Sequence, residues 1–330
     1  MRLPTFTAAV AACAFAMLPR PARAVPPPHN VKAKYLYDVS DNTGTVGSSW
    51  ANLTYDAEHK ELYVVDQHDA TVGIFNDVGM EIYRFGDDAE MGTIVGIDVM
   101  EGGDLLTLSM DQGKPVLHRC NFRGDPKQRI ELSKVPPDFG KDFAPETVAF
   151  RGGKLYLAQR GSMKVLIADA SGACLEAHDY FHELGLDKLR DLRAGSPGMR
   201  AFTVAADGTM LFTVAPMFKV FVIGPDGKAS SFGQRGGAPG KFNITGAAVR
   251  DEHGRIFVSD ILKCAVLVFD DKFEFLGQFG QRGWDPGDLI APFDLAVADG
   301  KLFVSQSGGR GVSVYEISIQ EPAPEKTAAQ

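Results

Sequence analysis

Phe232-Gly233-Gln234-Arg235 opens a stretch near the C-terminus that the chain contains twice, because Phe279-Gly280-Gln281-Arg282 repeats it 47 residues later. The first copy ends on Arg255-Ile256-Phe257-Val258-Ser259-Asp260, and the second ends on Lys301-Leu302-Phe303-Val304-Ser305-Gln306. Short β-rich runs that are separated by glycine-rich turns, with a period of about 45 residues, are typical of the blades of a β-propeller. This repeat therefore predicts the architecture of the chain.

Each repeat is marked by its expected second strand, an apolar run that ends on a polar or small residue. Six such runs start at positions 61, 104, 154, 210, 255 and 301. The spacings of 43 to 56 residues leave room for four strands of about five residues in each repeat. We therefore predict an all-β fold, a six-bladed β-propeller with four antiparallel strands per blade.

The last repeat lacks a fourth strand, because its third strand, expected at Val312–Ile317, runs into a tail that we expect to be disordered over residues 320–330. An alternating run at Lys34–Val39 precedes the first repeat and supplies a spare strand. We expect this N-terminal strand to pair with Val312–Ile317, to complete the last blade and to close the ring, which removes an exposed sheet edge. The propeller then spans residues 34–319.

The N-terminus has the pattern of a secretory signal peptide over residues 1–24. Arg2 precedes an apolar run from Phe6 to Leu18, and Ala22-x-Ala24 is a small-residue cleavage pattern. The apolar run is too short for a typical membrane span, so we expect no transmembrane segment in the mature chain.

Cleavage between Ala24 and Val25 would give a secreted or periplasmic protein, in which the proline-rich residues 25–33 form a linker. The alternative is a lipoprotein signal at Cys13, which would cut the apolar run short. Three cysteines would remain after cleavage, none of them in a Cys-x-x-Cys motif, and we expect them to behave as small buried hydrophobic side chains. The sequence does not decide whether Cys120 and Cys174 form a disulfide.

The formal net charge of the whole chain is −8, and removal of the signal peptide would make it −11. An acidic chain without a basic cluster argues against nucleic acid as a partner. The sequence also lacks the Gly-x-Ser-x-Gly elbow, the phosphate-binding loop and the dinucleotide-binding fingerprint that mark several enzyme classes.

The motifs of the repeat resemble the NHL repeat, the building unit of a family of six-bladed propellers. The matching motifs are Phe-Gly-x-x-Gly, Pro-Gly-x-Phe and Gly-x-Ile-Phe-Val-x-Asp, and they are clearest in residues 232–306. The resemblance implies a propeller that binds proteins or RNA, or, as in some relatives, a metal-dependent lyase or hydrolase. The zinc-carrying lyases use histidines from several blades, whereas here only His68 falls at an equivalent position, so this part of the resemblance does not carry over.

The polar residue that ends each second strand is expected to point toward one mouth of the central channel. With the residues just behind them, the candidates at this mouth are Asp66, His68, Gln159, Arg160, Asp260, Lys263, Gln306 and Arg310. Mixed charge at a confined mouth suits a polar ligand or a side chain inserted by a partner. The carboxylates of Asp66 and Asp260 would suit Ca²⁺. Alternatively, both carboxylates accept N–H groups in their own turns.

The long connections between strands lie on one face of the predicted propeller, and long loops on a rigid scaffold often carry binding residues. On this face Arg235, Arg282 and Trp284 are candidates for contact with a partner, since aromatic and arginine side chains are frequent interface anchors. One connection, residues 180–199, is expected to contain a short amphipathic helix over His182–Arg190.

We therefore predict a non-catalytic binding or scaffolding propeller, which engages a protein partner or a polar ligand through its long-loop face. No cofactor is expected apart from Ca²⁺. The alternative function is a metal-assisted lyase or hydrolase whose site lies at the mouth of the central channel.

Overall fold

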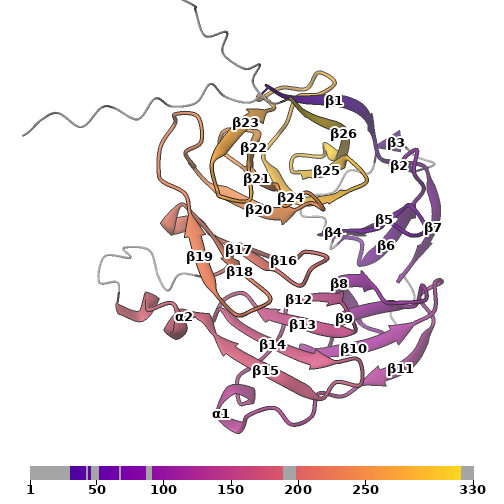
Figure 1. Cartoon of the computed structure of the whole chain (residues 1–330). Coiled ribbons are helices and arrows are strands. Elements are labelled where there is room, and N and C mark those ends of the chain that lie inside the picture. The colour runs from indigo at the N-terminus through magenta and orange to yellow at the C-terminus, as the bar shows by residue number, and fades with distance from the viewer. Residues whose placement is uncertain are drawn as a thin grey trace, which may run out of the picture.

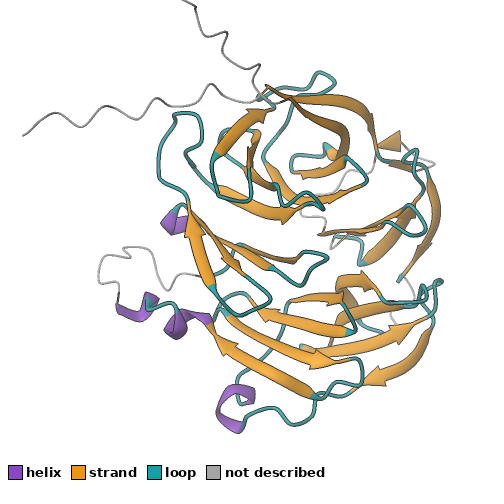
Figure 2. Ribbon diagram, viewed as in Figure 1, coloured by secondary structure: helices purple, strands orange, loops and turns teal. Residues whose placement is uncertain are grey.

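The chain forms six four-stranded antiparallel sheets around a common centre, which confirms the predicted six-bladed β-propeller (Figure 1). The computed structural model describes residues 30–41, 44–45, 52–66, 68–86, 91–188 and 198–320. The expected signal peptide, including Cys13, residues 25–29 of the expected linker, and residues 321–330 lie outside this part of the chain. Figure 2 shows that strands make up nearly all of the regular structure.

The strands follow one another along the chain within each blade. The first three blades consist of β4 (Asn52–Asp56), β5 (Glu61–Asp66), β6 (Thr71–Phe75) and β7 (Glu81–Phe85); β8 (Thr93–Val99), β9 (Leu105–Asp111), β10 (Lys114–Cys120) and β11 (Pro126–Ile130); and β12 (Thr147–Arg151), β13 (Lys154–Gln159), β14 (Lys164–Asp169) and β15 (Cys174–Asp179).

The remaining blades repeat this order, except that the last one borrows its outer strand. They consist of β16 (Ala201–Val204), β17 (Met210–Val214), β18 (Lys219–Ile223) and β19 (Ala229–Phe232); β20 (Thr245–Arg250), β21 (Ile256–Asp260), β22 (Ala265–Phe269) and β23 (Phe275–Phe279); and β24 (Pro292–Ala298), β25 (Lys301–Gln306), β26 (Gly311–Gln320) and β1 (Asn30–Asp38). The second strands β5, β9, β13, β17, β21 and β25 start within one residue of the predicted positions.

The middle strands of the blades are apolar on both faces because each blade is covered by a neighbour on either side. In β22 all five residues of Ala-Val-Leu-Val-Phe are buried, as expected for a strand without a solvent face. The buried apolar side chains form six clusters, and each cluster fills the space between two neighbouring blades. The core is thus a ring of six interfaces, which fixes the blades around the axis.

The first strands of the six blades form the innermost ring. Each of β4, β8, β12, β16, β20 and β24 contacts the first strand of the next blade, and β24 contacts β4. Side chains reinforce this ring: Asn52 donates through Nδ2 to the Val95 carbonyl at 2.8 Å, and Thr54 Oγ1 donates to the Ile97 carbonyl at 2.9 Å.

The ring closes as predicted, because β1 pairs antiparallel with β26, with Tyr35 opposite Tyr315. The Ser313 hydroxyl donates to Asp38 Oδ1 at 2.6 Å and reinforces this pairing. One boundary needs correction: β1 already begins at Asn30, so residues 30–33 are strand and not linker. The reason is that β26 extends to Gln320, the residue at which we expected the tail to begin, and offers backbone partners to the earlier residues.

Helices are short and lie in the connections: α1 (Pro137–Gly140), α2 (Tyr180–Glu183) and the 3-10 turns η1 (Leu186–Lys188) and η2 (Ala215–Met217). The predicted helix over His182–Arg190 is wrong as one element, because Gly185 adopts φ 66° and separates α2 from η1.

Among the described residues no helix is long and apolar enough to cross a membrane. The three described cysteines are free. The hairpin β2 (Ser40–Asp41) and β3 (Gly44–Thr45) follows β1.

Candidate functional site

The central channel contains a cavity of about 710 Å³ that is lined by the first strands of all six blades. Figure 1 shows these strands, β4, β8, β12, β16, β20 and β24, around the centre. The cavity has two different ends. The first strands begin at the end that carries the long inter-blade connections, which we call the long-loop end. They finish at the tight hairpins of the opposite end, which we call the hairpin end.

Charges at the hairpin end are paired across blade boundaries. Arg151 donates through Nη1 to Asp98 Oδ2 at 2.6 Å, and the same carboxylate oxygen accepts the Phe150 N–H at 2.7 Å. Arg250 forms a similar ion pair with Asp207 of the preceding blade. These pairs fasten neighbouring blades to each other, and their charges are largely balanced.

The long-loop end is different, because two arginines from blades 3 and 4 extend toward blade 6 on the other side of the ring. The Arg200 guanidinium lies 5.3 Å from the centre of the Phe293 ring. The positive charge of Arg160 acts on the carboxyl of Asp294 and lowers its pKa, although this is a minor influence there. All four side chains line the cavity, so two cations, an aromatic ring and a carboxyl share one end of the channel.

The backbone around the two arginines is held firmly. Arg160 follows β13, and its carbonyl accepts the Met199 N–H at 2.9 Å, while the Arg200 N–H donates to the Thr213 carbonyl at 2.7 Å. The Arg160 side chain donates to Glu146 Oε2 at 3.1 Å and to the Arg200 carbonyl at 3.5 Å. The site therefore rests on strand ends and not on a free loop.

Arg200 is a cation without an anionic partner within the described part of the chain. Its Nε atom is buried and has no hydrogen-bond partner among the described residues. Burial lowers the pKa of Arg200, and the like charge of Arg160 lowers it further. An anion that entered this end of the channel would stabilise the charged guanidinium and so offset both the effect of burial and the repulsion from Arg160.

Asp294 is a carboxyl that is half-buried in the channel wall. Burial raises its pKa to about 6, against the opposing effects of hydrogen bonds from the backbone of Leu53 and Leu295 and of the Arg160 charge. The Leu53 N–H donates to Oδ2 at 2.9 Å and links blade 6 to blade 1. A carboxyl with this pKa changes its protonation state close to neutral pH, which is unusual for aspartate.

Of the residues that we predicted at the channel mouth, only Arg160 lines the channel. The others that end second strands fasten their own blades. Asp260 is fully buried and accepts the N–H groups of Asn243 and Lys263, and Gln306 accepts the Ile290 N–H at 2.7 Å. Gln159 accepts the Ala144 N–H in the same way, at 3.3 Å.

The physical reason is that a second strand lies behind the first, about 4.8 Å farther from the axis. Its last side chain therefore meets the loop that leads into its own first strand before it can reach the channel. Asp66 shows the same behaviour within a turn, where it accepts the N–H groups of His68 and Asp69. The His68 side chain is exposed.

The remaining candidates lie on the long-loop face, away from the cavity. Lys263 Nζ donates to the carbonyls of Ala238 and Lys241. Arg235 lies over the Phe218 ring, with 5.3 Å between its Cζ and the ring centre, and Arg282 is exposed. These side chains are not gathered around one ligand position.

Trp284 stands apart because its side chain is 66% exposed. Arg310 fixes the loop that carries it, donating to the Trp284 and Asp285 carbonyls at 2.6 and 2.9 Å.

The residues that sequence reasoning missed are Arg200, Phe293 and Asp294. Their only sequence signal is position: Arg200 directly precedes β16, and Phe293 and Asp294 are the second and third residues of β24, so all three lie near the start of a strand of the innermost ring. A scan for charged residues at the starts of first strands, in place of the ends of second strands, would have found Arg200 and Asp294.

Calcium binding through Asp66 and Asp260 does not fit the structure. The two residues belong to blades 1 and 5, and both are more than 90% buried. Each uses its carboxylate oxygens to accept N–H groups from its own loop, whereas Ca²⁺ needs six to eight oxygen ligands at one point. Within the described residues no group of three or more His, Cys, Asp or Glu side chains is placed to hold a metal ion.

No protein-family model matches the chain, and no curated protein matches it significantly. Solved structures do resemble it. A streptogramin B lyase is 10% identical, with a TM-score of 0.56 over 88% of this chain and 98% of the lyase. A protein of unknown function from Bacteroides thetaiotaomicron is 13% identical, with a TM-score of 0.60 over 88% of this chain and 76% of its own.

A luciferin-regenerating enzyme is 12% identical, with a TM-score of 0.55 over 89% of this chain and 98% of the enzyme. These proteins include enzymes of different kinds. Identity this low shows a shared propeller fold, and a fold by itself does not specify an activity.

Proposed function

We propose that this protein is a non-catalytic binding propeller, which holds a small anionic ligand at the long-loop end of its central channel. The observation that carries the proposal is Arg200, whose partly buried guanidinium has a buried Nε atom without a partner, lacks an anionic partner within the described residues and stands beside a second cation, Arg160. Arginine is well suited to bind a carboxylate or phosphate through two parallel hydrogen bonds.

The cavity supports the proposal by its size and by its walls. A volume of about 710 Å³ lies within the usual range of small-molecule sites. Below the two arginines the walls include Leu53, Val95 and Val297, which suit the body of a small ligand. Phe293 offers an aromatic face beside the cations.

Two expectations from the sequence remain part of this proposal. The first is that the chain is an NHL-type propeller, and the second is that a signal peptide is cleaved at Ala24 and directs the protein to the periplasm or the outside of the cell. A ligand-binding propeller in the cell envelope would be suited to capture small metabolites. Intact-mass measurement of exported protein tests the second expectation: a lipid-modified N-terminus at Cys13 would contradict it.

Calorimetric titration with lactate, propionate and inorganic phosphate tests the ligand site. We expect at least one of these anions to bind, and Arg200→Gln to weaken its binding by about tenfold or more, because a hydrogen-bonded charge contributes on the order of 1.5–3 kcal/mol. Arg282→Gln is the matched control, since this arginine is exposed and does not line the channel. Equal binding by the parent and Arg200→Gln, or no binding of any of the three anions, would overturn the proposal.

A protein partner on the same face is the second candidate, and it is favoured by Trp284. An exposed tryptophan on a loop that Arg310 holds rigid has the properties of an interface anchor. In a pull-down from the native envelope, Trp284→Ala should lose a partner that the parent protein captures. Lys272→Gln should retain it, because Lys272 is exposed in the tight turn between β22 and β23, at the hairpin end.

Catalysis in the channel is the third candidate, and it is favoured by Asp294. A carboxyl with a pKa of about 6 can serve as a general acid or base in a lyase or hydrolase. Metal analysis of the purified protein, together with turnover assays of the parent and Asp294→Asn, tests this alternative. Turnover of a lactone or ester by the parent that Asp294→Asn abolishes would favour an enzyme over a binding protein.

A further inference from the structure

We propose that the long-loop face over blade 5 is a docking surface for an acidic segment of a partner protein, a segment that also carries apolar side chains. The surface is formed by the connections into and out of blade 5 and by the turn between β21 and β22. Its exposed side chains, which we call the blade 5 surface, are Arg235, Ile244, Leu262, Arg282 and Trp284. The inference does not rest on the anion site in the channel. It gives the protein partner considered above a defined surface and a chemical class.

The apolar part of the surface begins where the connection into blade 5 meets the turn between β21 and β22. Oδ1 of Asp260 accepts the Ile244 N–H at 3.3 Å and the Leu262 N–H at 3.2 Å. The Ile261 N–H donates to the Ile244 carbonyl at 2.8 Å. The backbones of Ile244 and Leu262 are therefore fixed next to each other on one buried carboxylate.

The rest of the incoming connection is fastened to the same turn. Lys263 Nζ donates to the Ala238 carbonyl at 3.0 Å and to the Lys241 carbonyl at 2.6 Å. Farther along, the Arg235 guanidinium is supported from below by the Phe218 ring. This side of the surface is thus built on fixed backbone, which lowers the entropy that a partner must remove on binding.

The outgoing connection starts beside the turn as well. A Cβ atom added at Gly280 would lie only 3.0 Å from the carbonyl oxygen of Cys264, so this backbone passes closely over the end of the turn. Two residues later the connection presents Arg282, and then Trp284, whose carbonyl accepts a hydrogen bond from Arg310 at 2.6 Å. The turn that carries Leu262 therefore lies between the two connections.

The apolar side chains of the surface are exposed to an extent that is uncommon for their types. The exposed fraction is 66% for Trp284, 64% for Leu262 and 38% for Ile244. Large apolar side chains that gather on a rigid part of a protein surface are typical of interaction sites, and tryptophan is a frequent anchor of protein interfaces.

The charges of the surface indicate the sign of the partner. Arg235 and Arg282 are exposed, and neither forms an ion pair with a described carboxylate, whereas the arginines at the hairpin end are paired. Asp285 is the single exposed carboxyl of the two connections as far as the structure describes them. Asp288 is turned into its own loop, where Oδ2 accepts the Asp285 N–H at 3.3 Å. The unpaired arginines favour a partner that brings carboxylates, which arginine binds through two parallel hydrogen bonds.

A protein segment fits this surface better than the two other large anionic partners. Ile244 and Leu262 stand between the arginines, and aliphatic side chains have no counterpart on a phosphate backbone, which argues against RNA. Two exposed arginines on a chain with a net charge of −8 give little attraction to an anionic membrane, since each cation near such a surface contributes only about 1 kcal/mol.

The experiment measures the binding of short fluorescent peptides to the full chain by fluorescence anisotropy. The acidic probe alternates glutamate with leucine and phenylalanine, and the basic probe has lysine in place of every glutamate. The parent protein should bind the acidic probe about tenfold more tightly or better, because the arginines attract one probe and repel the other. Added salt should weaken this binding, since the charges are exposed.

Two variants remove the charged and the apolar parts of the surface separately. The double variant Arg235→Gln/Arg282→Gln should weaken binding of the acidic probe by about fivefold or more, and Leu262→Ser by a similar factor, because it removes exposed apolar area. Matched controls should bind like the parent. They are Lys114→Gln/Lys272→Gln, which removes two exposed charges from blade 2 and from the hairpin end, and Leu175→Ser, which removes a leucine that is 51% exposed on β15.

The outcomes decide between the partners. Equal binding of the two probes, or unchanged binding by both surface variants, would overturn the inference. So would binding of an RNA oligonucleotide or of phosphatidylglycerol vesicles by a parent protein that ignores the acidic probe. If neither probe binds, the acidic class is refuted, whether or not Trp284→Ala loses a captured protein. Thermal denaturation checks the folding of each variant, and Leu262→Ser carries the test alone if the double variant does not fold. The anion titrations test the channel site separately.

Discussion

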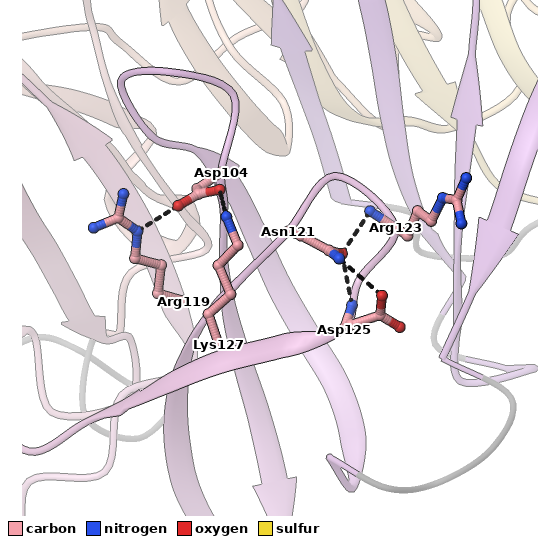
Figure 3. Close-up of polar contacts among 6 residues, drawn as sticks. All are labelled: Asp104, Arg119, Asn121, Arg123, Asp125 and Lys127. Carbon is pink, nitrogen blue, oxygen red and sulfur yellow. Dashed lines mark hydrogen bonds and ion pairs between the residues drawn. The ribbon is translucent and has the colours of Figure 1, made fainter.

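Asp104 and Asp294 are both partly buried carboxylates, yet their pKa values move in opposite directions. Asp104 directly precedes β9, the second strand of blade 2, and its carboxylate lies between Lys127 and Arg119, as Figure 3 shows. Lys127 Nζ is 2.5 Å from Oδ1, and Arg119 Nε is 2.6 Å from Oδ2. The hydrogen bond from Lys127, followed by that from Arg119, lowers its pKa against the effect of burial. Asp294 has no ion pair among the described residues, and burial raises its pKa to about 6.

The polar side chains around Asp104 find their hydrogen-bond and ion-pair partners within blade 2. Beside it, Asn121 accepts the Arg123 and Asp125 N–H groups and donates to Asp125 Oδ2 (Figure 3). Both carboxylates drawn there, Asp104 and Asp125, have side-chain partners from the same blade. At the long-loop end of the channel, by contrast, Arg200 and Asp294 keep unused hydrogen-bonding capacity. The comparison indicates that paired carboxylates hold this propeller together, and that unpaired ones in the channel are available to a ligand.

The largest expected effect tests the closed ring on which this comparison depends. Deletion of residues 25–40 removes β1 and exposes the edge of β26, which is an unfavourable, aggregation-prone arrangement. We expect loss of solubility or of cooperative unfolding, measured by thermal denaturation. A deletion variant that melts like the parent would contradict the closure of the ring by β1.

Asp260→Ala is expected to have the next largest effect, because it removes the acceptor of four backbone N–H groups, those of Asn243, Ile244, Leu262 and Lys263. The free energy of unfolding should fall by about 3 kcal/mol, since each unsatisfied buried group is costly. Urea denaturation measures it. A change below about 1 kcal/mol would show that Asp260 is not a structural fastener and would return it to the list of ligand-binding candidates.

Asp104→Ala should destabilise the protein by about 1 kcal/mol, because the ion pairs with Arg119 and Lys127 are partly solvent-exposed and such pairs contribute little. Ligand binding should not change, since this site lies away from the channel. Urea denaturation and the lactate titration check the two statements. Weaker lactate binding in this variant would contradict the separation of the ion pairs around Asp104 from the ligand site in the channel.

Asp294→Asn should change stability in the opposite direction. The pKa of Asp294 rises from 3.8 in the unfolded chain to about 6 in the folded protein. Between these two pH values the folded state keeps a proton that the unfolded state has already released. The free energy of unfolding of the parent therefore falls as the pH rises from about 4 to about 6. Removal of the charge should stabilise the fold at pH 7.5 by on the order of 1 kcal/mol, after allowance for exposure to the channel. The gain over the parent should grow between pH 4 and pH 6 and stay constant above. Equal pH profiles of the two proteins would contradict a raised pKa.

Arg160→Gln tests the smallest effect, the influence of one channel arginine on Asp294. The Arg160 charge lowers the pKa of Asp294, so its removal should move this pKa further up. Nuclear magnetic resonance titration of the aspartate carboxyls measures the shift, with Asp104 as the internal reference that should not move. A pKa of Asp294 that stays constant would show that Arg160 does not reach across the channel.

The fold was predictable in detail because its signals are local and repeated. The six second strands could be placed to within one residue at their start, since each is an apolar run between turn residues. Closure of the ring could be predicted from a missing strand at one end of the chain and a spare strand at the other. The start of β1 at Asn30 could not, because pairing over residues 30–33 depends on how far β26 extends.

The number of blades, their strand order and the face with the long loops could be read from local sequence, because hydrophobic periodicity and turn residues act over a few neighbouring positions. Which polar residues meet in the channel depends on how the blades are arranged around the axis. Arg160, Arg200 and Asp294 are up to 134 residues apart in the chain, and the curvature of the ring brings them to one end of the channel. Asp260 and Gln306, which end equivalent strands, are instead turned to their own loops, because the innermost strand stands between them and the axis.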